Sequence, residues 1–147
     1  MAINKIYAET QELNRDRALA DITAPSTAPT AIQSGVPVVL GSRPAVSLTA
    51  SGGSTKTETN LGAGVTSITF TNGGVGNEDG HATFAFDGTF EFAVTGATAT
   101  TKDDVKVYIT SGGELTLTAS TNTHYGYTDY PQGYQKVAGR APVKIGA

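Results

Sequence analysis

Apolar and polar positions alternate along most of this chain, in short runs. From residue 36 valine and leucine recur at every second position, and Gly41 to Pro44 interrupt the run. The same pattern returns in VKVYI, ELTLT and APVKI. Such alternation is typical of strands with one buried face, and glycine-rich turns between them are typical of sandwiches and barrels. The sequence therefore predicts an all-β fold, a small β-sandwich or barrel of short antiparallel strands with an extended N-terminal arm.

The stretch ATFAFDGTFEFAV, residues 82–94, contains four phenylalanines around an Asp-Gly pair. A two-residue turn at that pair would place the rings of its two halves on opposite faces. A three-residue loop that ends in a left-handed Gly88 separates apolar from polar side chains instead. We therefore predict the second hairpin, with Glu91 in water. Three rings then share one core-facing side: Phe84, Phe90 and Phe92.

Further strands are predicted on both sides of this hairpin. VTSITFTN places Ile68 and Phe70 on one face, and VKVYITSGGELTLTA forms two strands joined by a turn. HYGYTDY and APVKIGA supply the last strands. Residues 50–64 and the segment GGVGNEDG are interpreted as polar surface loops. The other apolar side chains that share faces are Val36, Val38, Leu40, Val46, Leu48, Val105, Val107, Ile109, Leu115, Leu117, Val143 and Ile145.

The first thirty residues follow a different pattern. A few apolar residues fall loosely at helical spacing among charges, and two prolines then interrupt a Ser/Thr/Ala run. Proline in that run disfavours both a helix and a central strand. We predict two parts, an extended arm over residues 1–30 and a β-domain over 31–147; a mobile tail is the alternative for the arm. The apolar arm residues are Ile3, Ile6, Tyr7 and Leu13.

Composition narrows the possible chemistry. The chain has no cysteine, which excludes disulfides, thiolate catalysis and Cys-ligated metal sites. Its net charge of −3 gives no overall attraction to nucleic acid or to an anionic membrane. No segment approaches the roughly 20 apolar residues of a membrane-spanning helix. The N-terminus lacks the apolar core of a secretory signal, so we expect the protein to stay where it is made.

Candidate catalytic and metal-binding residues form no recognisable set. GVGNEDG precedes a strand rather than the helix that a phosphate cradle needs, and its acids lack the spacing of a calcium loop. His81 and His124 have no ligand partner at helical spacing, and Asp103 and Asp104 are adjacent in a turn. A Ser-His-Asp triad built from His124 and Asp129 would lack a nucleophile elbow. We expect no enzyme activity, no cofactor and no metal.

The segment HYGYTDYPQGY gathers four tyrosines within ten positions. Tyrosine combines rigid apolar area with a polar tip, which suits interfaces. Three interpretations remain open: a rim that closes one end of a barrel, a contact with a neighbouring subunit, or a stacking surface for sugars. The residues are Tyr125, Tyr127, Tyr130 and Tyr134.

Five segments occur in a characteristic order: TAPTAIQSGVPVVLGSRPAVSLT, FAFDGTFEF, DDVKVYITSGGELTLT, HYGYTDY and APVKIGA. Over residues 31–147 their order and spacing resemble the bacteriophage capsid decoration, or cement, proteins. Residues 1–30 and the loop 51–64 are longer than in that pattern. The matching positions are Ser34, Gly35, Val38, Val39, Gly41, Gly88, Phe90, Glu91, Phe92, Val107, Tyr108, Gly113, Leu115 and Thr116.

The resemblance implies a homotrimer at threefold and quasi-threefold positions on the outside of a phage head. It further implies synthesis in the host cytoplasm, the major capsid protein as partner, no active site, and resistance to the pressure of packaged DNA. An unpaired arm suits this role because it can add to a partner's strand edge, and three arms on one trimer raise the effective concentration. We expect residues 2–22 to anchor the protein through Ile3, Ile6, Tyr7 and Leu13, and the four tyrosines to contact neighbouring subunits.

A carbohydrate-binding β-sandwich, as a free module or a head or tail appendage, is the rival interpretation. Exposed tyrosines and Ser/Thr-rich faces are compatible with it. A small hydrolase ranks third, because no catalytic set is recognisable.

Overall fold

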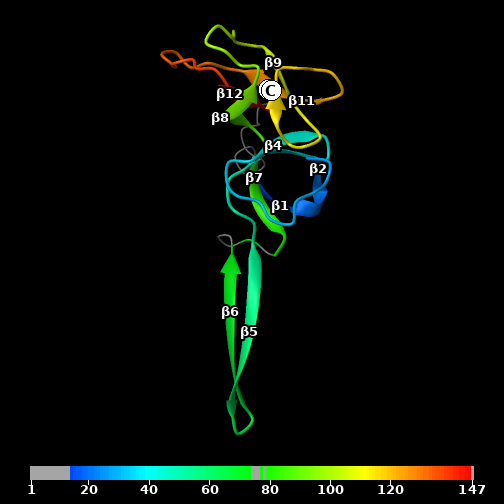
Figure 1. The fold of residues 1–147 in the computed structure, drawn as a ribbon, viewed down its shortest axis with the longest axis vertical. Helices are drawn as coiled ribbons and strands as arrows, with labels where there is room; N and C mark the ends of the chain where they lie inside the picture. The colour runs from blue at the N-terminus through cyan, green and yellow to red at the C-terminus, as the bar shows by residue number, and fades with distance from the viewer. Residues whose placement is uncertain (1–13, 74–76, 78, 147) are drawn as a thin grey trace, which may run out of the picture.

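The computed structural model describes residues 14–73, 77 and 79–146. The described chain is nearly all β, which confirms the predicted fold class. It forms three parts: a five-stranded sheet, a small closed barrel and a two-stranded hairpin (Figure 1).

The five-stranded sheet, here called the first sheet, has the order β1-β7-β4-β3-β2, and every pairing in it is antiparallel. A single 3₁₀ turn, η1 (Leu19–Asp21), joins β1 to β2. Proline stands at the first position of β3, where a strand tolerates its missing N–H. The strands are β1 (Asn14–Ala18), β2 (Ile22–Ala24), β3 (Pro37–Leu40), β4 (Arg43–Ser47) and β7 (His81–Ala85).

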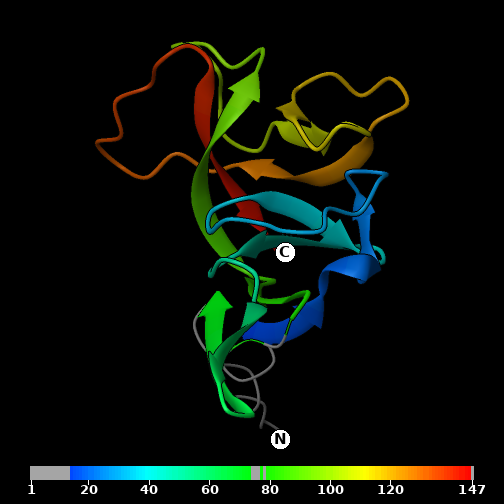
Figure 2. The same cartoon turned by 60° about the horizontal axis from the view of Figure 1, so that its bottom comes forward.

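The barrel closes in the order β10-β8-β12-β11-β9. Its β10–β8 pairing is parallel and the others are antiparallel. Figure 2 shows the barrel strands, from light green β8 to red β12, above the blue and cyan strands of the first sheet. The strands are β8 (Gly88–Thr95), β9 (Lys106–Ile109), β10 (Leu115–Thr116), β11 (Thr123–Thr128) and β12 (Arg140–Ile145).

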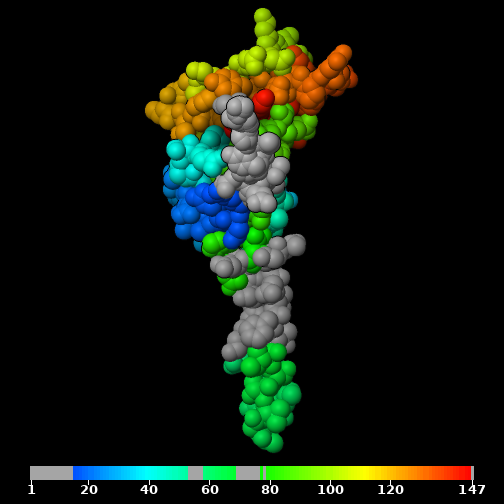
Figure 3. Space-filling model, turned by 180° about the vertical axis from the view of Figure 1, so that it is seen from behind, coloured from blue at the N-terminus to red at the C-terminus, as the bar shows by residue number. Residues whose placement is uncertain are grey.

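The third part is a long hairpin of β5 (Gly53–Gly62) and β6 (Val65–Gly73). Its register runs from Gly53 opposite Gly73 to Gly62 opposite Val65. The turn uses left-handed backbone at Ala63 and Gly64. The described tip projects as a slender arm away from the body (Figure 3). The predicted polar loop over residues 50–64 is therefore wrong, since most of that segment is a strand.

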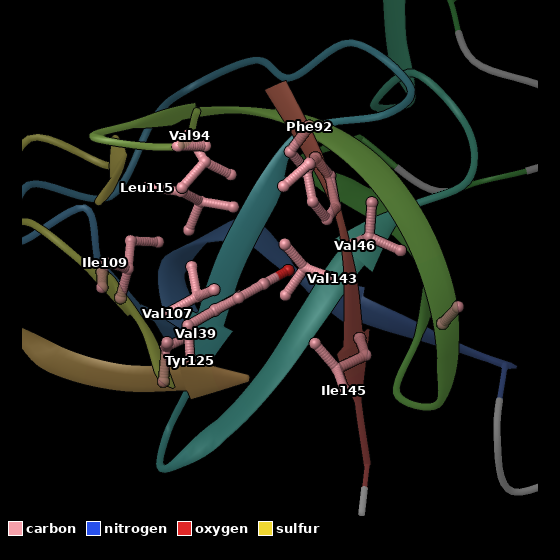
Figure 4. Close-up of a cluster of buried hydrophobic side chains, with 14 residues drawn as sticks. Val39, Val46, Phe92, Val94, Val107, Ile109, Leu115, Tyr125, Val143 and Ile145 are labelled. Carbon is pink, nitrogen blue, oxygen red and sulfur yellow. The ribbon is translucent and has the colours of Figure 1, made fainter. Parts of the chain in front are cut away.

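Two hydrophobic cores lie on opposite faces of the first sheet. Alternation along β3 explains the arrangement, because Val38 and Leu40 pack into the outer core while Val39 packs toward the barrel. Neighbouring β4 does the same with Ala45 and Val46. On the face toward the barrel, side chains of the first sheet pack in one cluster with inner side chains from every barrel strand (Figure 4). The first sheet thus has the barrel core on one face and the outer core on the other.

The predicted phenylalanine hairpin does not form. Strand β7 pairs with β1 and β4 in the first sheet, whereas β8 pairs with β12 and β10 in the barrel. The Asp-Gly pair is the corner where the chain changes sheet, and Gly88 has a φ of 120° there. Phe84 and Phe92 are buried as expected, but in different cores.

The expected alternation holds in the barrel. The register pairs Leu115 with Ile109, as the predicted turn between them requires. Val107, Val143 and Ile145 are buried. Outside the barrel, two apolar side chains that the alternation predicts on a buried face are exposed: Leu48 at 41% and Ile68 at 50%.

The described part of the predicted N-terminal arm is paired. Strand β1 lies along β7, and β2 lies along β3. Leu19, Ile22 and Ala24 are buried in the two cores. The β-body therefore includes residues 14–24, and the expected boundary at residue 30 lies inside it.

Candidate functional site

Tyr125 is part of the core. Its side chain is 1% exposed, and its hydroxyl donates a 2.6 Å hydrogen bond to the carbonyl of Ala45. Figure 4 shows the ring crossing from the barrel toward the first sheet. Burial raises the pKa of Tyr125. This residue joins barrel and sheet inside one protomer, so the prediction that it contacts a neighbouring subunit is wrong.

Tyr127 belongs to an aromatic row on the barrel. The His124 ring stacks edge-on between Tyr108 and Tyr127, with centroid distances of 5.8 and 4.9 Å. Edge-to-face rings of this kind stabilise each other, and they leave the half-buried Tyr127 accessible.

Tyr130 and Tyr134 lie together in the loop between β11 and β12. Their ring centroids are 5.5 Å apart, and the Lys136 ammonium lies 4.3 Å from the Tyr130 centroid. Each of the two tyrosines makes a hydrogen bond that holds the loop to the body. The Tyr130 amide donates to Asp103 Oδ1 at 2.6 Å, and the Tyr134 hydroxyl donates to Glu91 Oε2 at 2.6 Å.

Glu91 is the charged centre of this loop attachment. Besides Tyr134, it binds the Arg140 guanidinium at 2.9 Å. The Tyr134 hydrogen bond, followed by that from Arg140, lowers the pKa of Glu91. The same contact with Glu91 is the main cause that raises the pKa of Tyr134. Glu91 faces water, as the sequence predicted, and holds the tyrosine loop against β8.

The hairpin carries exposed apolar side chains far from both cores. Leu61 is 64%, Val65 is 55% and Ile68 is 50% exposed. Its register also alternates hydroxyl pairs, such as Thr59 with Ser67, with mixed pairs, such as Glu58 with Ile68. A two-stranded hairpin is marginally stable by itself in water, and its outer edges offer unpaired backbone. The described tip of the hairpin therefore exposes apolar side chains to solvent.

The predicted arm residues Ile3, Ile6, Tyr7 and Leu13 lie outside the described residues. The pattern predicts a strand at VTSITFTN, which is β6, but a loop where β5 lies. A signal for β5 is present, because threonine, a β-branched residue with strand preference, recurs at alternate positions in TKTETN.

The histidine and aspartate side chains considered as catalytic or metal-binding groups contact neighbouring residues of the fold. His124 Nε2 lies 3.1 Å from the Gly126 carbonyl, while Asp129 accepts from Thr89 at 2.8 Å, so the triad drawn from them is not assembled. His81 Nδ1 is 3.2 Å from Asp16 Oδ2. Within the described ranges, no group of three or more acidic, histidine or cysteine side chains could hold a metal ion. No helix in the described part is long and apolar enough to cross a membrane.

Comparison with protein-family models, with curated proteins and with solved structures found no match for this chain.

Proposed function

We propose that this chain is a bacteriophage capsid decoration protein. It binds the outside of the head as a homotrimer, with the major capsid protein as its partner, and strengthens the shell against packaged DNA. The observation that carries the proposal is the projecting β5–β6 hairpin, which exposes Leu61, Val65 and Ile68 and so offers apolar side chains to a partner surface.

The segments that carry the sequence resemblance form the body. The Val-Val pair lies in β3, the Gly-x-Phe-Glu-Phe motif in β8, and the Val-Tyr and Leu-Thr motifs in β9 and β10. The long insertion relative to that pattern, residues 51–64, is mostly β5. We therefore assign the resemblance to the body and the attachment to the capsid to the hairpin.

We assign the contact between subunits of the trimer to the surface tyrosines. Tyr127, Tyr130 and Tyr134 remain near the surface after Tyr125 is assigned to the core. Cyclic symmetry lets one such heterologous patch close on itself. Tyr127→Ala with Tyr130→Ala should convert a trimer to monomers in light scattering; a variant that stays trimeric moves the contact elsewhere.

Binding to phage heads that lack this protein tests the function. We expect the wild type to cosediment with heads. The hairpin variant Leu61→Ser/Val65→Ser/Ile68→Ser should bind at least tenfold more weakly, because three apolar side chains no longer leave water.

The matched control is Leu48→Ser/Val137→Ser, which removes exposed apolar side chains of the body, 41% and 44% exposed. It should bind like the wild type. Failure of the wild type to bind would overturn the function, whereas equal binding by the hairpin variant would overturn the role of the hairpin alone.

A further inference from the structure

One edge of β8 is open along most of its length. On one side β8 pairs with β12 from Gly88 to Ala93. On the other side β10 covers only Val94 and Thr95. In the described ranges no strand pairs with residues 88–93 on that second side. An unpaired strand edge is a template for another strand.

The backbone of Glu91 points to the open side. The register places Glu91 opposite Pro142, whose carbonyl accepts a 3.0 Å hydrogen bond from the Asp129 amide on the β11 side. Pro142 therefore faces β11, and Glu91 makes no backbone hydrogen bond to β12. Val94 confirms the alternation, because its amide donates to the Gly139 carbonyl, before β12, at 2.9 Å. The N–H and C=O of Glu91 have no partner among the described residues.

A groove of about 430 Å³ lies beside this edge. It is bounded by β8, by the turn that enters β10 and by the segment that enters β3. Its apolar lining comes from Val36, Pro37, Phe92 and Leu115. The unpaired backbone of Glu91 therefore adjoins a space that can take apolar side chains.

The charged groups of the groove select the occupant. Glu91 is already neutralised by Arg140 at 2.9 Å. Glu114 is exposed, and in the described part of the chain no cation lies within ion-pair distance of it. An extended segment with an aliphatic residue beside a lysine or arginine fits this combination, because the cation would reach Glu114 while the aliphatic side chain enters the groove.

We infer that the open edge of β8 receives an extended strand of the major capsid protein that carries an aliphatic residue next to a lysine or arginine. The inference rests on the proposed function for the identity of the partner. Main-chain hydrogen bonds to Glu91 give affinity, and the groove and Glu114 give specificity.

Two substitutions at one position isolate the backbone hydrogen bond. Glu91→Ala removes the carboxylate and keeps the N–H, whereas Glu91→Pro removes both. Both variants lose the carboxylate that holds the tyrosine loop, so the comparison is made between them and not with the wild type. With heads that lack this protein, Glu91→Pro should bind at least tenfold more weakly than Glu91→Ala, which corresponds to about 1.4 kcal/mol. Equal binding by the two variants would overturn the inference and leave the function intact; a wild type that binds no heads would overturn both.

Hydrogen exchange of the wild type serves where Glu91→Pro fails to fold. The Glu91 amide should exchange at least tenfold more slowly on heads than in the free trimer. An unchanged rate would overturn the inference, as would an amide already protected in the free trimer, which would show that a second copy fills the edge. Glu114→Lys should weaken head binding at least fivefold, and unchanged binding would contradict the assigned charge of the partner strand.

Discussion

At the scale of single residues, the two most informative side chains are Tyr125 and Glu91. Tyr125 is buried and links barrel to sheet through the Ala45 carbonyl. Glu91 is exposed and holds the tyrosine loop through Tyr134 and Arg140. The alternation in the sequence predicted that Glu91 faces water. It could not separate Tyr125 from the other tyrosines, because burial of one ring in four depends on which sheet lies behind it.

Tyr125→Phe should destabilise the protein by about 1–3 kcal/mol, because the buried Ala45 carbonyl loses its donor. Chemical denaturation of both proteins measures this difference. Tyr127→Phe is the matched control and should change the free energy of unfolding by less than about 0.5 kcal/mol. Equal effects of the two substitutions would contradict the role of the buried hydroxyl.

The carboxyl of Glu91 should titrate below the ordinary range of glutamate, because Tyr134 and Arg140 stabilise its charged form. A depressed pKa in the folded state means that the attachment is present above the ordinary glutamate pKa and is lost as pH falls through the folded value. NMR titration should show the midpoint rising in Tyr134→Phe and unchanged in Tyr127→Phe. An unchanged midpoint in Tyr134→Phe would show that the hydroxyl does not bind the carboxylate.

At the scale of elements, periodicity predicted strands better than their partners. The runs that became β3, β9 and β12 were recognised because one set of alternate positions is apolar. The pairing of β7 with β8 was wrong, since an Asp-Gly pair between two alternating runs fits a sheet-changing corner as well as a hairpin. Only the β6 half of the hairpin is predicted as a strand, because the sequence of β5 is mostly polar and has no alternating apolar positions.

Gly126→Ala tests the close approach of β11 and β12. A Cβ at this position would collide with the Lys144 carbonyl and lie 2.9 Å from Val143 Cγ1. The strands would have to move apart, and we expect a loss of about 1–3 kcal/mol in the free energy of unfolding. Gly112→Ala is the control, because its Cβ would meet Thr110 Oγ1 at an ordinary 3.7 Å. A stable Gly126→Ala would contradict this packing.

At the scale of the whole molecule, the β5–β6 hairpin projects from a body made of one sheet and one barrel. The body has a core on each face of the first sheet, and β1 and β2 are part of that sheet. The sequence of residues 1–30 does not predict that β1 and β2 belong to this sheet. Their short apolar stretches become strands only because β7 and β3 lie beside them. Residues 1–13 of the predicted arm lie outside the described residues, and among the described residues the projecting element is the β5–β6 hairpin.

Two N-terminal deletions test whether β1 and β2 stabilise the body. Removal of residues 2–13 stops before β1, whereas removal of 2–22 also deletes β1 together with the buried Leu19 and Ile22. Each of these two side chains contributes about 1.5–3 kcal/mol by burial. The longer deletion should therefore melt well below the shorter one in calorimetry. Equal melting temperatures would contradict the place of β1 and β2 in the body.

The most direct test of the proposed function is a reconstruction of phage heads decorated with the wild-type protein. We predict three copies around each threefold or quasi-threefold position on the outside of the shell, with the β5–β6 tip against a capsid subunit. A shell without this protein on its outer surface, or copies whose hairpins extend into solvent without touching a neighbour, would contradict the account.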